Sequence, residues 1–240
     1  METEFSKLFG YIRKLRIRYM NTLSAYKIYD CFNTLVATNI VGKERSNKNV
    51  ATFNSFKYFF QPVREACRCY FLIELAKFFD KSTQSLTVFN ILDYSEKNIK
   101  KLTKKDFLDY HKGRKILPEL FKNYKPLLLS DIRRLRKKID SNKVILKKLK
   151  DYRDKYLAHD DIKKIKVKLT KKEIEEIFDL IEKFIDLYYL KLDFASNSYI
   201  NFEEKPIKET ERIIEYLQSY EEYRIKEIEK KYKVNLRSKK

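Results

Sequence analysis

The scarcity of glycine and proline is the feature that most constrains the fold of this chain. Its 240 residues include only 3 Gly and 4 Pro, so the backbone has few places at which it can turn sharply. Such a chain favours a few long helices over many short strands. With 17 Phe and 18 Tyr, it also carries enough apolar volume for a sizeable core, which argues against disorder.

Apolar residues recur at helical spacing along most of the chain. We expect helices over residues 5–40, 51–80, 127–157 and 171–196 and from Pro206 onward, with a short piece at 104–111 and a break at the polar stretch KERSNKN. Thr170 and Glu173 form the capping box that opens the fourth of the long helices. The pattern predicts an all-α antiparallel bundle with long N-terminal helices over residues 1–200. An appended amphipathic helix with a basic tail is expected over residues 201–240.

The composition and the motifs of the chain also indicate its cellular compartment and whether it needs a cofactor. Three Cys and no signal-peptide pattern indicate a reducing environment, and no apolar run is long enough to span a bilayer. We therefore expect a cytoplasmic protein with no membrane partner. The sequence has no zinc-ligand spacing and no Gly-rich phosphate loop, so neither a metal nor a cofactor is predicted.

Positive charge is concentrated in one third of the chain. The formal net charge is +20, and residues 97–172 hold 27 basic and 9 acidic side chains, leaving 27 and 25 for the rest. A general bias toward lysine would not leave the flanks balanced. The localisation favours a polyanionic partner, with nucleic acid preferred to an anionic membrane surface or an acidic protein.

The helix expected over residues 127–157 carries an apolar seam at spacings of three and four residues. Asn142 and Arg153 interrupt this seam, whereas most other cations of the helix lie off it. A guanidinium on an inward face needs partners, because an unpaired buried charge is strongly destabilising. Arg153 is therefore either a structural residue paired with a carboxylate such as Glu65 or Glu74, or a residue that faces a cleft or a subunit interface.

His159 follows Arg153 in the stretch YRDKYLAHDD and favours the second reading. If the last turn tightens to three residues per turn, as helix ends often do, positions 153, 156 and 159 fall on one side. His159 would then lie at a helix C-terminus beside an arginine that could hold a phosphate. His111 has no arginine at a matching distance and is expected to be a surface residue.

The R-x5-H pattern formed by Arg153 and His159, with Asp154 directly after the arginine, resembles the R-x4-6-H motif of the HEPN superfamily. The stretches ELAKFFDKSTQSL and YRDKYLAHDD are similar to the abortive-infection (AbiU2-like) branch of that superfamily. The resemblance covers residues 56–189.

This resemblance implies a HEPN-type helical bundle that forms a homodimer and cleaves RNA without metal by attack of the RNA's own 2′-hydroxyl. His159 would be the acid and base, Arg153 would stabilise the charge on the phosphate, and Asp154 would orient them. Contacts to RNA are expected from Lys155, Tyr156, Lys150, Lys163 and Lys164. Tyr156 belongs to a Tyr-rich helix, where a tyrosine is more often a core residue than one that stacks on bases.

The expected partners are RNA, a second copy of the chain, and an antitoxin or defence protein. HEPN toxins silenced by a nucleotidyltransferase antitoxin carry a Tyr two residues after the His, and Asp161 stands there in this chain. That mode of control is therefore not expected. The alternative function is a non-catalytic helical module that binds nucleic acid through the lysine-rich third or acts as a scaffold.

Overall fold

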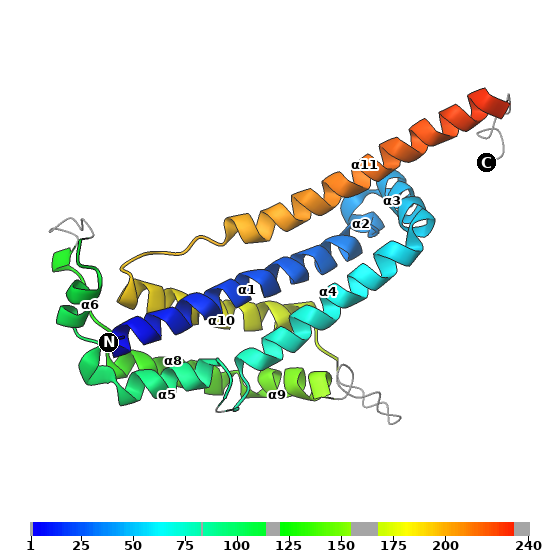
Figure 1. Cartoon of the computed structure of the whole chain (residues 1–240). Helices are drawn as coiled ribbons and strands as arrows, with labels where there is room; N and C mark the ends of the chain where they lie inside the picture. The colour runs from blue at the N-terminus through cyan, green and yellow to red at the C-terminus, as the bar shows by residue number, and fades with distance from the viewer. Residues whose placement is uncertain (1, 83, 114–120, 155–167, 233–240) are drawn as a thin grey trace. The chain divides into compact units, whose positions relative to one another are not determined.

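The structure is a computed structural model that describes residues 2–82, 84–113, 121–154 and 168–232. In this part of the chain all regular elements are helices, and no strand occurs (Figure 1). The α-helices are α1 (Glu4–Thr34), α2 (Thr38–Val41), α3 (Lys43–Ser55), α4 (Lys57–Phe78), α5 (Val88–Lys97), α6 (Lys104–Tyr110), α8 (Leu129–Ser141), α9 (Lys143–Tyr152), α10 (Lys171–Leu192) and α11 (Ile200–Tyr232). The all-α prediction is confirmed.

The chain divides into two compact units. The first unit comprises residues 1–23 and 69–199, and the second comprises residues 24–68 and 200–240. The candidate site described below lies in the first unit. The expected division into a bundle over 1–200 and an appendage over 201–240 remains a prediction.

The core of the first unit is formed by the apolar residues that recur at helical spacing in α1 and α10. Fully buried side chains recur along the N-terminal part of α1 and along α10, namely Phe5, Leu8, Ile12, Leu15, Tyr19, Ile177, Ile181, Phe184, Ile185 and Tyr188. α10 packs against both α8 and α9, and α5 packs against α8. The two deepest tyrosines keep polar partners, because Tyr19 donates to Glu182 and the Tyr188 hydroxyl lies 2.8 Å from that of Ser95. Burial without these bonds would destabilise the core.

The helix expected over residues 5–40 ends earlier, at Thr34, and α2 follows as a separate short helix. The polar stretch KERSNKN, expected to be a break, is instead the start of α3. Its buried face is polar: Ser46 donates to the carbonyl of Val36, and Asn49 donates to that of Leu35. These bonds satisfy carbonyls that the end of α1 leaves open. A search for apolar periodicity misses such a helix because its inward residues are not apolar.

Helix α3 ends at Ser55 and α4 begins at Lys57, so the single helix expected over 51–80 is two helices. Pro62 lies inside α4. The capping box of Thr170 and Glu173 opens α10 as predicted.

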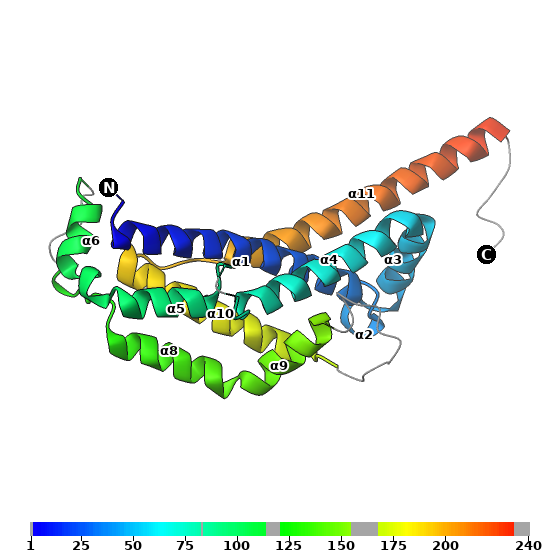
Figure 2. The same cartoon turned by 60° about the horizontal axis from the view of Figure 1, so that its bottom comes forward.

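In its described part, the long helix expected over residues 127–157 is also two helices, which Figure 2 shows meeting at a bend. Asn142 lies at the bend, ends α8 and precedes α9. Its side chain donates to the carbonyl of Lys138 at 2.8 Å, which explains the first polar interruption of the seam. Ile132, Leu135, Ile139 and Leu149 of the seam are buried as predicted.

His111 is not the surface residue that the sequence suggested. Its side chain is 8% exposed, and its Nε2 atom lies 2.8 Å from the carbonyl oxygen of Leu192. The ring packs against Phe107 with centroids 4.5 Å apart. It therefore serves the core of the first unit.

None of the helices in the described ranges combines the length and the apolar character that crossing a membrane requires.

Candidate functional site

Arg153 follows α9 directly, and Asp154 is the last residue described before position 168. Its side chain is 19% exposed, so the sequence correctly placed this guanidinium on a largely covered face. Nε donates to Asp154 Oδ1 at 2.7 Å, and Nη1 donates to Asp80 Oδ2 at 3.3 Å. The hydrogen bonds to Asp154 and then to Asp80 raise the pKa of Arg153, which keeps it cationic.

The partners of Arg153 differ from those that the sequence suggested. Glu74 accepts from Arg18 at 2.5 Å and from Lys77 at 2.8 Å. Glu65 pairs with Arg68, three residues along the same helix. The carboxylate that reaches Arg153 from elsewhere in the chain is Asp80, just after α4, because α4 ends beside α9.

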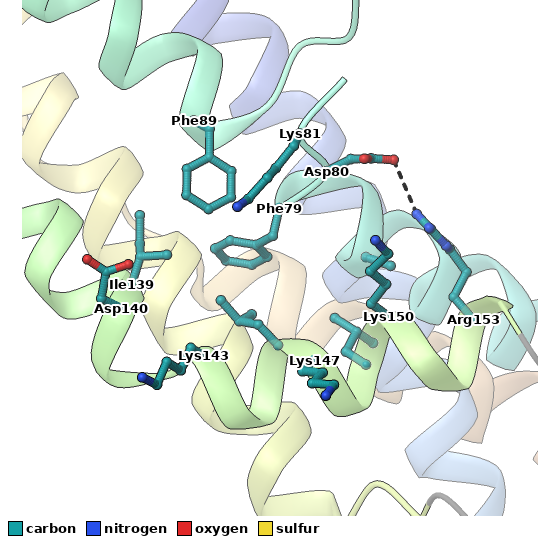
Figure 3. A pocket seen from close by; sticks show the side chains of 13 residues that line it. Phe79, Asp80, Lys81, Phe89, Ile139, Asp140, Lys143, Lys147, Lys150 and Arg153 are labelled. Atoms are coloured by element: carbon teal, nitrogen blue, oxygen red, sulfur yellow. Dashed lines mark hydrogen bonds and ion pairs between the residues drawn. The ribbon is translucent and has the colours of Figure 1, made fainter. Parts of the chain in front are cut away.

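A pocket of about 350 Å³ opens beside Arg153 (Figure 3). The end of α4, the residues after it, α5, α8 and α9 all contribute to its walls. Five cations line it, Lys81, Lys143, Lys147, Lys150 and Arg153, against two carboxylates, Asp80 and Asp140. The pocket is therefore strongly positive, which suits an anionic ligand.

The side chains of this pocket are not equivalent. In Figure 3, Lys81 and Lys150 extend toward the pocket interior, whereas Lys143 and Lys147 extend along its rim. Phe79 and Phe89 contribute aromatic surface, and Ile139 contributes apolar surface below them. The pocket thus combines cations with aromatic rings.

A second pocket adjoins the first and shares Asp80 and Arg153 with it. Its other walls include Arg18, Lys77 and Glu74, whose ion pairs were given above. Arg18 also donates to the carbonyl of Leu86 at 3.0 Å and lies over the ring of Phe78. Arg153 therefore lines both pockets, and its positive charge is close to a ligand bound in either one.

Of the residues predicted from the sequence, the structure describes Arg153, Asp154 and Lys150 and brings them together. Lys155, Tyr156, His159, Lys163 and Lys164 lie outside the described residues, as does Asp161. Their roles remain predictions. The described ranges contain no group of three or more His, Cys, Asp and Glu side chains arranged to hold a metal ion.

The sequence did not indicate most of the residues that line this pocket, among them Phe79, Asp80, Lys81 and Phe89. Three of these, Phe79, Asp80 and Lys81, are in the stretch ELAKFFDKSTQSL, which runs from the last turns of α4 into the segment after it. The available signal was the pair Phe78 and Phe79, since a helix that buries one of two adjacent residues turns the other away. Nothing in the sequence shows that this turn lies next to α9.

An all-α unit with a charged arginine at the end of an inward-facing helix has the arrangement expected of a HEPN protein. The chain matches the family model described as AbiU2, of the HEPN class, over residues 8–213. It therefore belongs to the AbiU2 family of HEPN proteins, and the match extends beyond the segment 56–189 from which the resemblance was inferred. Neither a curated protein nor a solved structure matches the chain.

Proposed function

We propose that this protein is a metal-independent endoribonuclease of HEPN type that acts in the cytoplasm, in phage defence or as a toxin. Family membership supports the proposal, because HEPN proteins are often ribonucleases or related to abortive infection. The observation that carries it is the fixed guanidinium of Arg153 at the edge of a strongly positive pocket.

The reaction needs no group beyond the protein and the RNA. The 2′-oxygen of a ribose attacks the adjacent phosphorus, the bond from phosphorus to the 5′-oxygen breaks, and a 2′,3′-cyclic phosphate and a 5′-hydroxyl result. His159 takes the proton of the 2′-hydroxyl, and the leaving 5′-oxygen receives a proton from a protonated His159 side chain. Arg153 stabilises the negative charge that grows on the phosphoryl oxygens.

Asp154 Oδ1 accepts from Nε and also lies 2.7 Å from Nη2, and Asp80 accepts from Nη1, so two carboxylates hold the guanidinium at the edge of the pocket. The remaining predicted contacts, Lys150, Lys155, Tyr156, Lys163 and Lys164, would bind the RNA on either side of the cleaved bond. HEPN domains commonly dimerise, and a homodimer would bring two copies of Arg153 and His159 into one composite site. An antitoxin or defence partner would then act by covering that site.

Purified protein incubated with single-stranded RNA in EDTA tests the proposal. We expect cleavage products with cyclic phosphate ends, and loss of cleavage in both Arg153→Ala and His159→Ala. Lys205→Ala, which removes an exposed lysine of α11 outside residues 97–172, is the control and should cleave as the wild type does. Full activity in His159→Ala would exclude the mechanism.

A second candidate is a non-catalytic module that binds nucleic acid or acts as a scaffold. The lysines of α9 favour it, since Lys143, Lys147 and Lys150 line the pocket without forming an ion pair to another described residue. It predicts salt-sensitive binding of RNA that survives His159→Ala, with no cleavage. Co-purification with an acidic protein and no affinity for RNA would instead indicate a scaffold.

A further inference from the structure

We propose that the pocket beside Arg153 binds one unpaired nucleotide of single-stranded RNA. Its base stacks on Phe79 and Phe89, and its flanking phosphates lie at Lys81 and Lys150. This inference rests on the proposed ribonuclease function and names the class of substrate that the same site takes.

The two phenylalanines are available because the core does not use them. The residue before each pocket phenylalanine packs in the core instead: Phe78 is fully buried and Val88 is 1% exposed. Phe79 and Phe89 are only partly buried, and both line the pocket. A partly exposed aromatic ring next to cations is the arrangement with which proteins stack unpaired bases.

Two lysines of the pocket are available to bind phosphate groups. Lys81 and Lys150 are exposed, point into the pocket, and form no ion pair with another described residue. Lys148 of the same helix differs, because it lies 2.5 Å from Glu173 and is neutralised there. Arg153 is held by its two aspartates, so the lysines are the cations most free to bind the backbone of a bound strand.

Aromatic rings together with lysines favour single-stranded RNA over a duplex or a polyanion without bases. A polyanion without bases would use the lysines but gain nothing from the rings. A duplex keeps its bases stacked on one another and could not place one on Phe79 or Phe89. The volume of about 350 Å³ is at the size where small-ligand sites begin and suits one nucleotide rather than several.

The test uses the full chain and a labelled eight-nucleotide single-stranded RNA with 2′-O-methyl riboses, which lacks the attacking hydroxyl and stays intact. Fluorescence anisotropy measures its Kd, and competition measures the Kd of inorganic polyphosphate. Phe89→Leu should weaken RNA binding about 5- to 150-fold, the range for loss of one stacked base, and leave polyphosphate binding unchanged. Lys150→Ala should weaken both ligands and reduce the salt slope for RNA by about 0.7.

Phe59→Leu is the matched control, since Phe59 is a 59% exposed phenylalanine that lines none of these pockets; it should bind RNA as the wild type does. Phe79→Leu serves as a second variant, and circular dichroism confirms that each variant folds. Equal loss of RNA and polyphosphate binding in both phenylalanine variants, or no loss in either, would overturn the inference. Equal affinity of the wild type for the corresponding duplex would do the same.

This experiment separates the inference from the proposed function. Base-dependent binding of the methylated strand with no cleavage of ordinary RNA would leave the nucleotide pocket and reject the ribonuclease. Cleavage of ordinary RNA at wild-type rates by Phe89→Leu, with unchanged binding, would leave the ribonuclease and reject the pocket.

Discussion

Arg153 donates from Nη1 to Asp80, a residue 73 positions earlier in the chain, across 3.3 Å. This pair joins the residue after α9 to the segment after α4, at the edge of the pocket that the two segments help to form. With Asp154 on the other side of the guanidinium, two carboxylates fix its plane. A side chain that would otherwise sample several rotamers is thereby preorganised for an anion.

Asp80→Ala should affect activity more than stability. The two side chains of the pair are 19% and 39% exposed, and such partly solvated pairs contribute about 0–1 kcal/mol to the free energy of unfolding. Loss of a fixed orientation is more costly, and we expect RNA cleavage to slow about 10-fold or more. Thermal unfolding and cleavage rates measured together check this. Asp109→Ala, at an exposed position of α6, is the control, and an equal loss of rate there would argue against a positioning role for Asp80.

Arg153→Lys separates the charge of the residue from its geometry. Lysine keeps the positive charge but cannot bind Asp80 and Asp154 at once through a planar fork. If Arg153 stabilises the transition state, the cleavage rate should fall about 10²–10³-fold while the Kd for the methylated strand changes little. Cleavage at the wild-type rate would show that a point charge is sufficient and that the guanidinium is structural.

The inward position of Arg153 could be predicted from the sequence because it depends on periodicity along one helix. Its partners could not. Asp80 reaches Arg153 because α4 ends beside α9, which is a long-range relationship, whereas Glu74, an equally suitable carboxylate by type, is paired with Arg18. The positive charge of Arg153 predicts that its partner is a carboxylate, but only the fold determines which carboxylate lies within reach.

The bend between α8 and α9 and the existence of α3 could not be predicted from apolar periodicity for a related reason. Asn142 and Ser46 are polar residues whose side chains bind backbone carbonyls at helix ends. Apolar periodicity reports which residues are buried by the hydrophobic effect and is silent on those buried by hydrogen bonding. The expected helix over 127–157 therefore looked continuous, and α3 looked like a break.

Tyr188→Phe tests the polar contact within the core of the first unit. The Tyr188 hydroxyl lies 2.8 Å from Ser95 Oγ, both groups are fully buried, and burial raises the pKa of the tyrosine. Removal of the hydroxyl should lower the free energy of unfolding by about 1 kcal/mol, since Ser95 keeps its bond to the carbonyl of Ile91. Tyr223→Phe, at a 61% exposed position, should leave urea unfolding unchanged. Equal midpoints for the two variants would contradict the assignment.

Glu74 should make the stability of the protein depend on pH in the acid range. Its side chain is 13% exposed, and burial alone would raise its pKa. Hydrogen bonds from Lys77 and Arg18 outweigh burial, so the pKa in the folded state lies below the ordinary 4.5. The carboxylate therefore contributes its full stability above about pH 4.5 and loses it as the pH falls through the lower folded pKa.

Glu74→Gln should accordingly lower the free energy of unfolding by about 1–3 kcal/mol at pH 7, the range for removal of a charge-assisted bond that leaves Arg18 underpaired. The difference from the wild type should shrink below pH 4.5, where the wild-type carboxyl also becomes neutral. Urea titrations at a series of pH values measure it. Glu209→Gln, an exposed carboxylate of α11, controls for the change in net charge and should follow the wild type throughout. A difference for Glu74→Gln that stays constant from pH 7 to acid would mean that shape, and not charge, explains the loss.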